Sequence, residues 1–302
     1  MIALRGIQKY FPSNGVTALD HADFDLRPGE IHALLGENGA GKSTLMHILA
    51  GHLIPGGGHI FIDGRETRFR SPADALAGGI GMVRQHPSLT PGFTVWEDCI
   101  LGAEPRSAGY INRGTARKLV RALSERWHFD LPIDQPTGRL TVSQRQKAAV
   151  LALLFRNTKF LIFDEPTAVL SPLEAEGIFG LFRALRSGGK GIVLISHKLE
   201  ETLGIADRVS VLRKGKTVAV MPAAALKPET LSALMFGGNT FSMEGLTQEI
   251  AQTTGTITLS VQNLSITAPG RPFIRGLSLD LPGGKILGIA GVRDSGLETL
   301  EL

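Results

Sequence analysis

One stretch carries most of the information in this chain: Ile31-His32-Ala33-Leu34-Leu35-Gly36-Glu37-Asn38-Gly39-Ala40-Gly41-Lys42-Ser43-Thr44. The apolar run over residues 31–35 predicts a buried strand, and residues 43–50 predict a helix with one apolar face. The residues from Gly36 onward fit the pattern G-x-x-x-x-G-K-[ST]. In a strand–loop–helix context this pattern predicts a phosphate-binding loop. The competing interpretation is a glycine-rich turn that binds nothing.

The residue types of this loop suit a nucleoside triphosphate. Its glycines permit backbone conformations and close approaches that a Cβ atom would prevent. Successive N–H groups can then point at phosphate oxygens at the positive end of the following helix. Lys42 can reach the β- and γ-phosphates, and the Ser43 hydroxyl can ligate Mg²⁺. We therefore expect the nucleotide to contact Gly36, Glu37, Asn38, Gly39, Ala40, Gly41, Lys42, Ser43 and Thr44.

Composition sets the broad class of the protein. The chain has 302 residues, 43% of them apolar and 20% charged, which is an ordinary globular balance. A net charge of +4 is too small to indicate nucleic-acid binding. The single cysteine, Cys99, excludes a disulfide framework and favours a reducing compartment. The N-terminus does not resemble a signal peptide, and the longest apolar run, residues 148–155, is too short to cross a bilayer. We expect any membrane role to come through a partner.

The order of the elements predicts an α/β fold. Residues 31–35, 160–163 and 191–195 are apolar throughout and separated by helical patterns, which indicates a mainly parallel core sheet. Before and around the loop, short strands predict an antiparallel β subdomain, at residues 2–12, 22–27 and 59–64. From about residue 94 to residue 155 the pattern is helical and predicts a helical subdomain.

The C-terminal part repeats the plan of the N-terminal part. Residues 238–256 are polar and predict a linker. Residues 258–291 then repeat the plan of residues 2–36, with two strands, a Pro-Gly turn, an apolar strand and a glycine. The loop that follows keeps the glycine spacing but has Leu297 where the lysine should be. We interpret residues 257–302 as the truncated start of a second copy of the first domain, residues 1–237.

A pair of carboxylates follows the apolar strand at residues 160–163. Asp164 ends a strand that lies beside the loop in such a fold, where it can hold the Mg²⁺ shell. Glu165 can orient or deprotonate a water for attack on the γ-phosphate. An acidic pair at a strand end is often only a turn or a helix cap.

These motifs resemble those of the ATP-binding cassette ATPases over residues 1 to about 237. Further residues match the family's pattern: Gln85 the Q-loop glutamine, Thr141, Ser143 and Gln144 the signature, His197 the switch histidine, and Phe11 the aromatic that stacks on adenine. The resemblance implies that the substrate is ATP with Mg²⁺. It implies that Ser43, Gln85 and Asp164 hold the metal, that Glu165, His197 and Gln85 act in hydrolysis, and that the signature contacts ATP in a partner's site. Tyr10 is an alternative to Phe11.

The sequence is more closely similar to the two-cassette importer ATPases for monosaccharides and nucleosides. The segments that carry this resemblance are Asp164–Pro172, Ser196–Glu201 and Leu234–Gly238, and residues 100–111 look more like the nucleoside branch. The resemblance implies an ATP-hydrolysing subunit on the cytoplasmic face of the membrane, bound peripherally to permease subunits that work with a solute-binding protein. A second cassette, in the same chain or in a homodimer, would complete the ATP site. No nucleic-acid partner is expected, and the region after Gln85 would contact the permease.

Three residues depart from the family pattern. Thr141 replaces a serine and Ser143 a glycine in the signature, and Ser171 replaces the aspartate of the D-loop. The Cβ of Ser143 predicts impaired turnover if close approach is needed there. Two alternatives therefore stay open: a soluble remodelling ATPase of the same family, and a catalytically impaired nucleotide-binding fragment. Against the first, the sequence has no long coiled-coil insertion and no strongly basic tract.

Overall fold

The computed structural model describes residues 1–84, 87–107, 109–168, 172–196, 198–237, 257–267, 273–289 and 296–300. The chain divides into two units, Met1–Thr240 and Phe241–Leu302. The predicted linker, residues 238–256, lies outside the described residues.

The first unit is built on a sheet of six strands in the order β12-β11-β3-β10-β9-β6. Their bounds are β3 (Ile31–Leu35), β6 (Ile80–Val83), β9 (Phe160–Asp164), β10 (Gly191–Ile195), β11 (Arg208–Arg213) and β12 (Lys216–Pro222). The pairs β11–β3, β3–β10, β10–β9 and β9–β6 are parallel, and β12 joins β11 as an antiparallel edge strand. The predicted α/β fold with a mainly parallel core sheet is confirmed.

A second, antiparallel sheet has the order β2-β1-β4-β5. Its strands are β1 (Ile2–Phe11), β2 (Val16–Leu26), β4 (Gly57–Ile62) and β5 (Arg65–Thr67). The predicted start of the second strand at residue 22 is wrong, because pairing with β1 extends back to Val16 opposite Phe11. Most side chains of residues 16–21 are exposed or half-buried, so this arm lacks the apolar alternation by which a strand is recognised.

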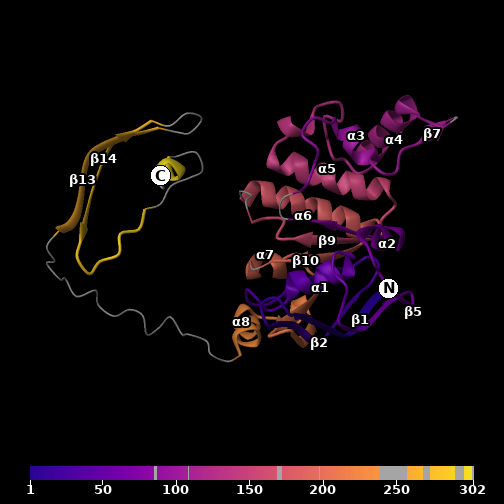
Figure 1. The fold of residues 1–302 in the computed structure, drawn as a ribbon, viewed down its shortest axis with the longest axis horizontal. Coiled ribbons are helices and arrows are strands. Elements are labelled where there is room, and N and C mark those ends of the chain that lie inside the picture. The colour runs from indigo at the N-terminus through magenta and orange to yellow at the C-terminus, as the bar shows by residue number, and fades with distance from the viewer. Residues whose placement is uncertain are drawn as a thin grey trace. The chain divides into compact units, whose positions relative to one another are not determined.

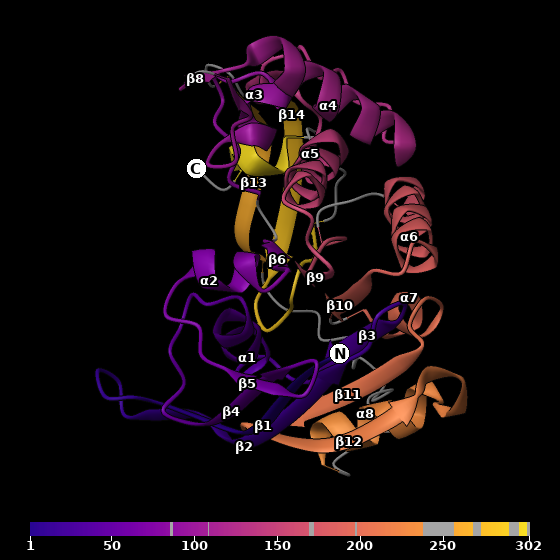
Figure 2. The same cartoon turned by 90° about the vertical axis from the view of Figure 1, so that its right-hand side faces the viewer.

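Helices cover both faces of the core sheet. They are α1 (Lys42–Leu49), α2 (Pro72–Ala77), α3 (Val95–Ile100), α4 (Arg113–Arg126), α5 (Val142–Phe155), α6 (Pro172–Ser187), α7 (Leu199–Leu203) and α8 (Pro228–Phe236). The helical stretch predicted over residues 94–155 is three helices, α3 to α5, with a small hairpin between the first two, β7 (Arg106–Ser107) and β8 (Tyr110–Ile111). In Figures 1 and 2, α3, α4 and α5 gather at one end of the first unit.

The central strands β9 and β10 are apolar on both faces because each face meets a separate core. Leu161 and Phe163 of β9 pack with the helices α3 to α6. Phe160 and Ile162, on the other face of the same strand, pack with α1 and with β1 and β2. The alternation of side chains along a strand therefore places α1, and the loop that precedes it, between the two sheets.

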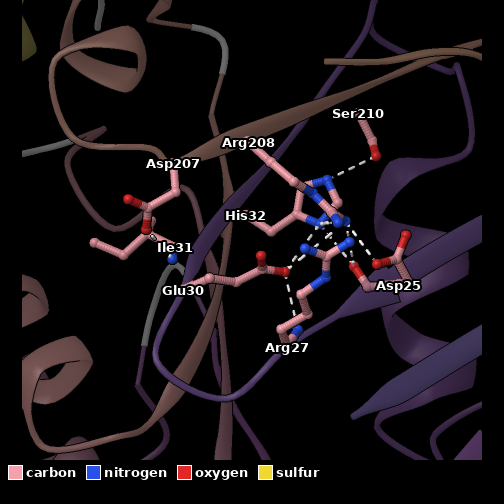
Figure 3. A network of polar contacts seen from close by, with 8 residues as sticks. All are labelled: Asp25, Arg27, Glu30, Ile31, His32, Asp207, Arg208 and Ser210. Carbon is pink, nitrogen blue, oxygen red and sulfur yellow. Dashed lines mark hydrogen bonds and ion pairs between the residues drawn. The ribbon is translucent and has the colours of Figure 1, made fainter. Parts of the chain in front are cut away.

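A buried polar network joins β2, β3 and β11 at the end of β3 that is remote from the loop (Figure 3). His32 is fully buried, and its Nδ1 lies 2.6 Å from the carbonyl oxygen of Asp25 while its Nε2 lies 2.8 Å from the Ser210 hydroxyl. Arg208 donates to the Asp25 carboxylate at 2.7 Å and lies 3.8 Å from Glu30. The Ile31 N–H donates to the Asp207 carboxylate at 2.9 Å.

Burial and the neighbouring Arg208 lower the pKa of His32 to about 4. The ring is therefore neutral at pH 7. The His32 Nδ1 faces both an acceptor, the Asp25 carbonyl, and a donor, the Arg208 guanidinium at 3.0 Å, while the Ser210 hydroxyl can either donate to Nε2 or accept from it. The network fixes three strands to one another at the base of the core sheet.

The second unit contains a hairpin of β13 (Ile257–Ile266) and β14 (Ile274–Pro282) and a short helix, α9 (Leu297–Leu300). None of the side chains described in β13 and β14 is buried. The apolar strand predicted between the Pro-Gly turn and residue 291 is not formed over residues 285–289, and Ile286 is fully exposed. A central strand of a parallel sheet needs neighbours on both edges, and the described part of this unit supplies none for residues 285–289.

Candidate functional site

The candidate phosphate loop connects β3 to α1, as predicted. A Cβ atom on Gly36 would lie 2.2 Å from the carbonyl oxygen of Leu212, and one on Gly41 would lie 2.4 Å from that of Ala18. Gly41 also has φ +104, a backbone conformation that side-chain-bearing residues rarely adopt. Both glycines are therefore required by the backbone of β11 and β2, which closes on the loop from behind.

Lys42 lies at the centre of the loop. Its ammonium donates to the carbonyl oxygens of Gly36 and Glu37 at 2.8 and 2.9 Å, and the residue is buried. Burial lowers the pKa of Lys42, while the nearby carboxylates of Glu165 and Asp164 raise it. The ammonium is thus bonded to two loop carbonyls and interacts with the charges of two acidic side chains.

The outer side of the loop is open to solvent. Glu37, Asn38, Gly39 and Ser43 are exposed, whereas Ala40 is buried and Thr44 half-buried. The loop is therefore accessible to a ligand as it stands.

Asp164 is the last residue of β9 and pairs with Ile195 of β10. Burial and the neighbouring Glu165 raise the pKa of Asp164, and His47 and Lys42 oppose that shift. The predicted carboxylate is therefore close enough to Lys42 for each to influence the charge of the other. This arrangement brings together the two halves of the expected metal–phosphate site.

Glu165 begins the turn that follows β9. Its φ of +47 lies in the left-handed region, which costs a residue with a side chain about 1–3 kcal/mol. Its N–H donates to the carbonyl oxygen of Ile195 at 3.0 Å, and its carbonyl accepts from the Ala168 N–H at 3.2 Å. Such backbone conformations gather at active sites, where the surrounding contacts maintain them.

His47 is a site residue that the sequence reasoning missed. It lies on α1 four residues after Ser43, on the same side of the helix, and its charge interacts with that of Asp164. Burial lowers the pKa of His47, Asp164 raises it, and Arg84 at the end of β6 lowers it further. The i+4 spacing from the serine was the available signal.

The signature residues form the start of α5. The Thr141 hydroxyl accepts from the Gln144 N–H at 3.2 Å, and the Gln144 side-chain oxygen accepts from the Thr141 N–H at 3.0 Å. This reciprocal cap satisfies two N–H groups at the helix start. Ser143 is half-buried in the first turn between them. The Thr141 hydroxyl keeps its proton available for donation to a ligand.

The remaining predicted residues lie on other elements or outside the described chain. Phe11 ends β1, and the Lys9 ammonium lies 5.4 Å from the centroid of its ring. Gln85, Ser171 and His197 lie outside the described residues, so their predicted roles stay predictions.

The side chains around Lys42 suit a magnesium triphosphate. The Ser43 hydroxyl and the Asp164 carboxylate are oxygen donors, which Mg²⁺ prefers. In the described part of the chain no three histidine, cysteine or acidic side chains gather to hold a metal by themselves. A divalent cation here would take its other ligands from phosphate oxygens and water, as Mg²⁺ does at nucleotide sites.

Comparison with known proteins agrees with this geometry. Residues 19–168 match the family described as ABC transporter. The chain is 40% identical over 280 residues to the nucleoside import ATP-binding protein NupA of Lactococcus lactis subsp. cremoris, a match that covers 92% of this chain and 55% of that protein. It is 42% identical over 299 residues to a putative ribose/galactose/methyl galactoside import ATP-binding protein of Burkholderia cenocepacia, covering 98% and 57%. The chain therefore spans about half the length of the curated relatives it matches.

Solved structures show the same fold. The structure of cbiO1 from Clostridium perfringens, part of the ABC transporter complex cbiONQ, has a TM-score of 0.65 at 27% identity and covers 76% of this chain and 92% of its own. The ADP conformation of the ATP-binding cassette MJ1267 has a TM-score of 0.66 at 23% identity, covering 78% and 94%. Among the described residues, no helix is both long and apolar enough to span a bilayer.

Proposed function

Since residues 19–168 form a domain of the ABC transporter family, we propose that this chain binds ATP with Mg²⁺ and hydrolyses it to drive an importer. The observation that carries the proposal is the position of Lys42. Its ammonium lies in a solvent-open glycine loop and interacts with the carboxylates of both Asp164 and Glu165.

The residues divide the work of phosphate transfer among them. The loop N–H groups and Lys42 would bind the phosphates, and Ser43 and Asp164 would hold Mg²⁺, which would neutralise charge on the phosphate oxygens. Glu165 accepts a proton from the attacking water. We assign Gln85 to the metal and to hydrolysis, His197 to hydrolysis, and Phe11 to stacking on adenine, all by resemblance to the family. Thr141, Ser143 and Gln144 would contact ATP bound to a partner cassette.

The transported solute is a nucleoside or a simple sugar in this proposal. Relatives named for nucleoside import and for ribose or galactose import match the chain at 40–42% identity, which supports an importer and leaves both solutes open. The partners would be permease subunits with a solute-binding protein, and a second cassette that completes the ATP site. The chain would then work peripherally on the cytoplasmic face of the membrane.

A groove beside β6 offers a place for the permease. It has a volume of about 390 Å³ and lies between the segment after β6 and helices α3 and α5. Arg84, Pro87 and Leu89 line one side, and Leu101 and Arg156 line the other. A short permease segment with both polar and apolar side chains would fit this groove. This agrees with the expectation that the region after Gln85 contacts the permease.

The test is ATP affinity in the Lys42→Ala variant. Loss of a charged hydrogen-bond donor costs about 1.5–3 kcal/mol, so the Kd for Mg-ATP should rise roughly 10- to 100-fold in an equilibrium titration. Lys147→Ala is the matched control, since Lys147 also donates to a backbone carbonyl, that of Phe129, but on α5. Equal ATP affinity in the parent and the Lys42→Ala variant would rule out the loop as the phosphate site.

A further inference from the structure

The turn from Glu165 to Ala168 is held in place by residues from two distant parts of the chain. Glu165 has a left-handed backbone conformation, which its own residue type does not favour. Such a conformation persists only where neighbouring contacts determine it. Besides the two backbone hydrogen bonds of Glu165 itself, the contacts made by the next two residues hold the turn in this conformation.

The first contact comes from α5. The side-chain amide of Gln146 donates to the carbonyl oxygen of Pro166 at 2.7 Å, and the residue is 3% exposed. The other polar atom of this side chain, Oε1, has no hydrogen-bond partner among the described residues. A buried glutamine with one unsatisfied polar atom lowers the stability of the folded state. Its presence here favours a positioning role for the one hydrogen bond that its side chain makes, to Pro166.

The second contact comes from the segment that follows β10. The Lys198 ammonium donates to the carbonyl oxygen of Thr167 at 3.1 Å and lies 3.1 Å from Glu201. The Thr167 hydroxyl donates to the other carboxylate oxygen of Glu201 at 3.1 Å. The three residues form a closed ring of charge-assisted hydrogen bonds, in which Thr167 is buried and the other two are half-buried.

The ring is itself anchored to the core sheet. The Lys198 N–H donates to the Ser196 hydroxyl at 3.0 Å, directly after β10. The carbonyl oxygen of Lys198 accepts from the hydroxyl of Thr202 at 2.7 Å, and Thr202 is fully buried. The positions of Lys198 and Glu201 are therefore set by the segment that follows β10 as well as by their contacts with the turn.

We propose that Gln146, Lys198 and Glu201 are positioning residues that clamp the Glu165–Ala168 turn from both sides and so aim the Glu165 carboxylate. The proposal rests on the proposed ATPase function. In this proposal, α5 and the segment after β10 together determine the direction of the Glu165 carboxylate.

Lys198→Met and Gln146→Met test the clamp in the full chain. Each variant keeps the length of the side chain and removes its hydrogen bonds to the turn. A misplacement of about 1 Å costs up to about 100-fold in rate, so kcat for Mg-ATP hydrolysis should fall roughly 10- to 100-fold. The Kd for Mg-ATP should stay within about twofold, because neither residue belongs to the phosphate loop. Lys198→Arg, which keeps the charge and the donors, should recover most of the rate.

Lys190→Met is the matched control. Lys190 also donates to a backbone carbonyl, that of Thr158 at 2.6 Å, but at the opposite end of β9. Its removal should lower stability without changing kcat. If Lys190→Met and Lys198→Met lower kcat and the unfolding midpoint alike, the contacts are merely structural and the proposal is overturned.

Amide hydrogen exchange tests the clamp without relying on hydrolysis. In Lys198→Met and Gln146→Met the amides of Glu165 and Ala168 should exchange at least about tenfold faster, with no change in the loop before α1. A parent that binds ATP but does not hydrolyse it would count against the proposed function, and exchange would still decide the clamp. Unchanged exchange at Glu165 and Ala168 in both variants would remove the proposal whatever the hydrolysis rate.

Discussion

Ser143 is the signature residue whose departure from the family pattern is expected to affect turnover. It lies in the first turn of α5, next to the reciprocal cap of Thr141 and Gln144. The helix forms normally with serine there, so the substitution does not disturb the fold. Its effect would fall on how closely a phosphate of a partner's ATP can approach the helix start, because a Cβ and a hydroxyl occupy space that glycine leaves free.

We expect Ser143→Gly to hydrolyse ATP faster than the parent, and Glu165→Gln in that background to slow hydrolysis by about 10²–10⁴-fold. Glutamine keeps the shape of Glu165 and cannot accept the proton from water. ATP should remain bound, so this double variant should also form a more stable ATP-dependent dimer. The measurements are steady-state phosphate release and dimer mass. Glu165 is not the base if the double variant releases phosphate at the rate of Ser143→Gly alone.

Local pattern was enough to place Gly36, Lys42 and Asp164, because a strand end fixes the residues that follow it. His47 was missed because what marks it is an interaction with the charge of Asp164, which lies more than a hundred residues further along the sequence. The contacts of Gln146, Lys198 and Glu201 with the turn after β9 likewise join segments far apart in the sequence. The i+4 spacing places His47 on the same side of α1 as Ser43, but no periodicity or spacing reports a pairing between segments so far apart in the sequence. The roles of Gln85 and His197 stay predictions.

Among the elements, β3 pairs with β11 through the backbone and also carries a buried histidine that contacts both β2 and β11. The pKa of His32 is lowered to about 4, so the folded state binds fewer protons than the unfolded state between that pH and 6.5. The stability contributed by neutral His32 is complete above pH 6.5 and is lost as the pH falls toward 4. Glu30, whose pKa burial raises, acts in the opposite direction, while Asp25, Arg27 and Arg208 are the charges beside the ring.

We expect acidification from pH 7 to pH 4 to lower the free energy of unfolding by about 3 kcal/mol through His32. Denaturant unfolding at several pH values should show a smaller decrease in His32→Gln than in the parent. His59→Gln is the control, because His59 is exposed and paired only with Glu66 at 2.8 Å. Parallel pH curves for the parent and His32→Gln would contradict the assignment.

The strands whose bounds were predicted best are those with apolar side chains on both faces. β3, β9 and β10 were expected at nearly the observed residues because each is buried throughout. The two errors have one cause. Both segments depend on neighbouring strands. The arm of β2 before residue 22 has a partner that the local pattern did not reveal, and residues 285–289 have none in the described part of the chain.

At the level of the whole molecule, the first unit is an α/β domain, whereas the described part of the second is a hairpin with no buried side chain in its two strands, together with a short helix. The exposed side chains of Leu259 and Ile289 have no covering layer in the described part of the chain. The assignment of residues 257–302 to the start of a second cassette stays a prediction, as does the boundary at residue 237. It agrees with the chain spanning about half the length of its relatives.

We expect a fragment of residues 238–302 to lack stable structure, because an isolated two-stranded hairpin is at best marginally stable in water. Its amides over residues 258–282 should exchange at nearly the rate of an unstructured peptide. The amides of β9 in the full chain serve as the protected reference. Slow exchange over 258–282 in the fragment would refute this expectation.

The glycines at 36 and 41 have a consequence for how this motif persists through mutation. Backbone oxygens of Leu212 and Ala18 occupy the space where their Cβ atoms would lie, so folding alone would select against substitution at both positions. Gly39 faces open space, and there it is the left-handed φ of +80, rather than a close neighbour, that favours glycine. In a copy of this domain that no longer bound nucleotide, the lysine could therefore be substituted while these two glycines were retained. The chain's own second loop, with glycine spacing intact and Leu297 in place of lysine, has the composition that such a substitution would leave.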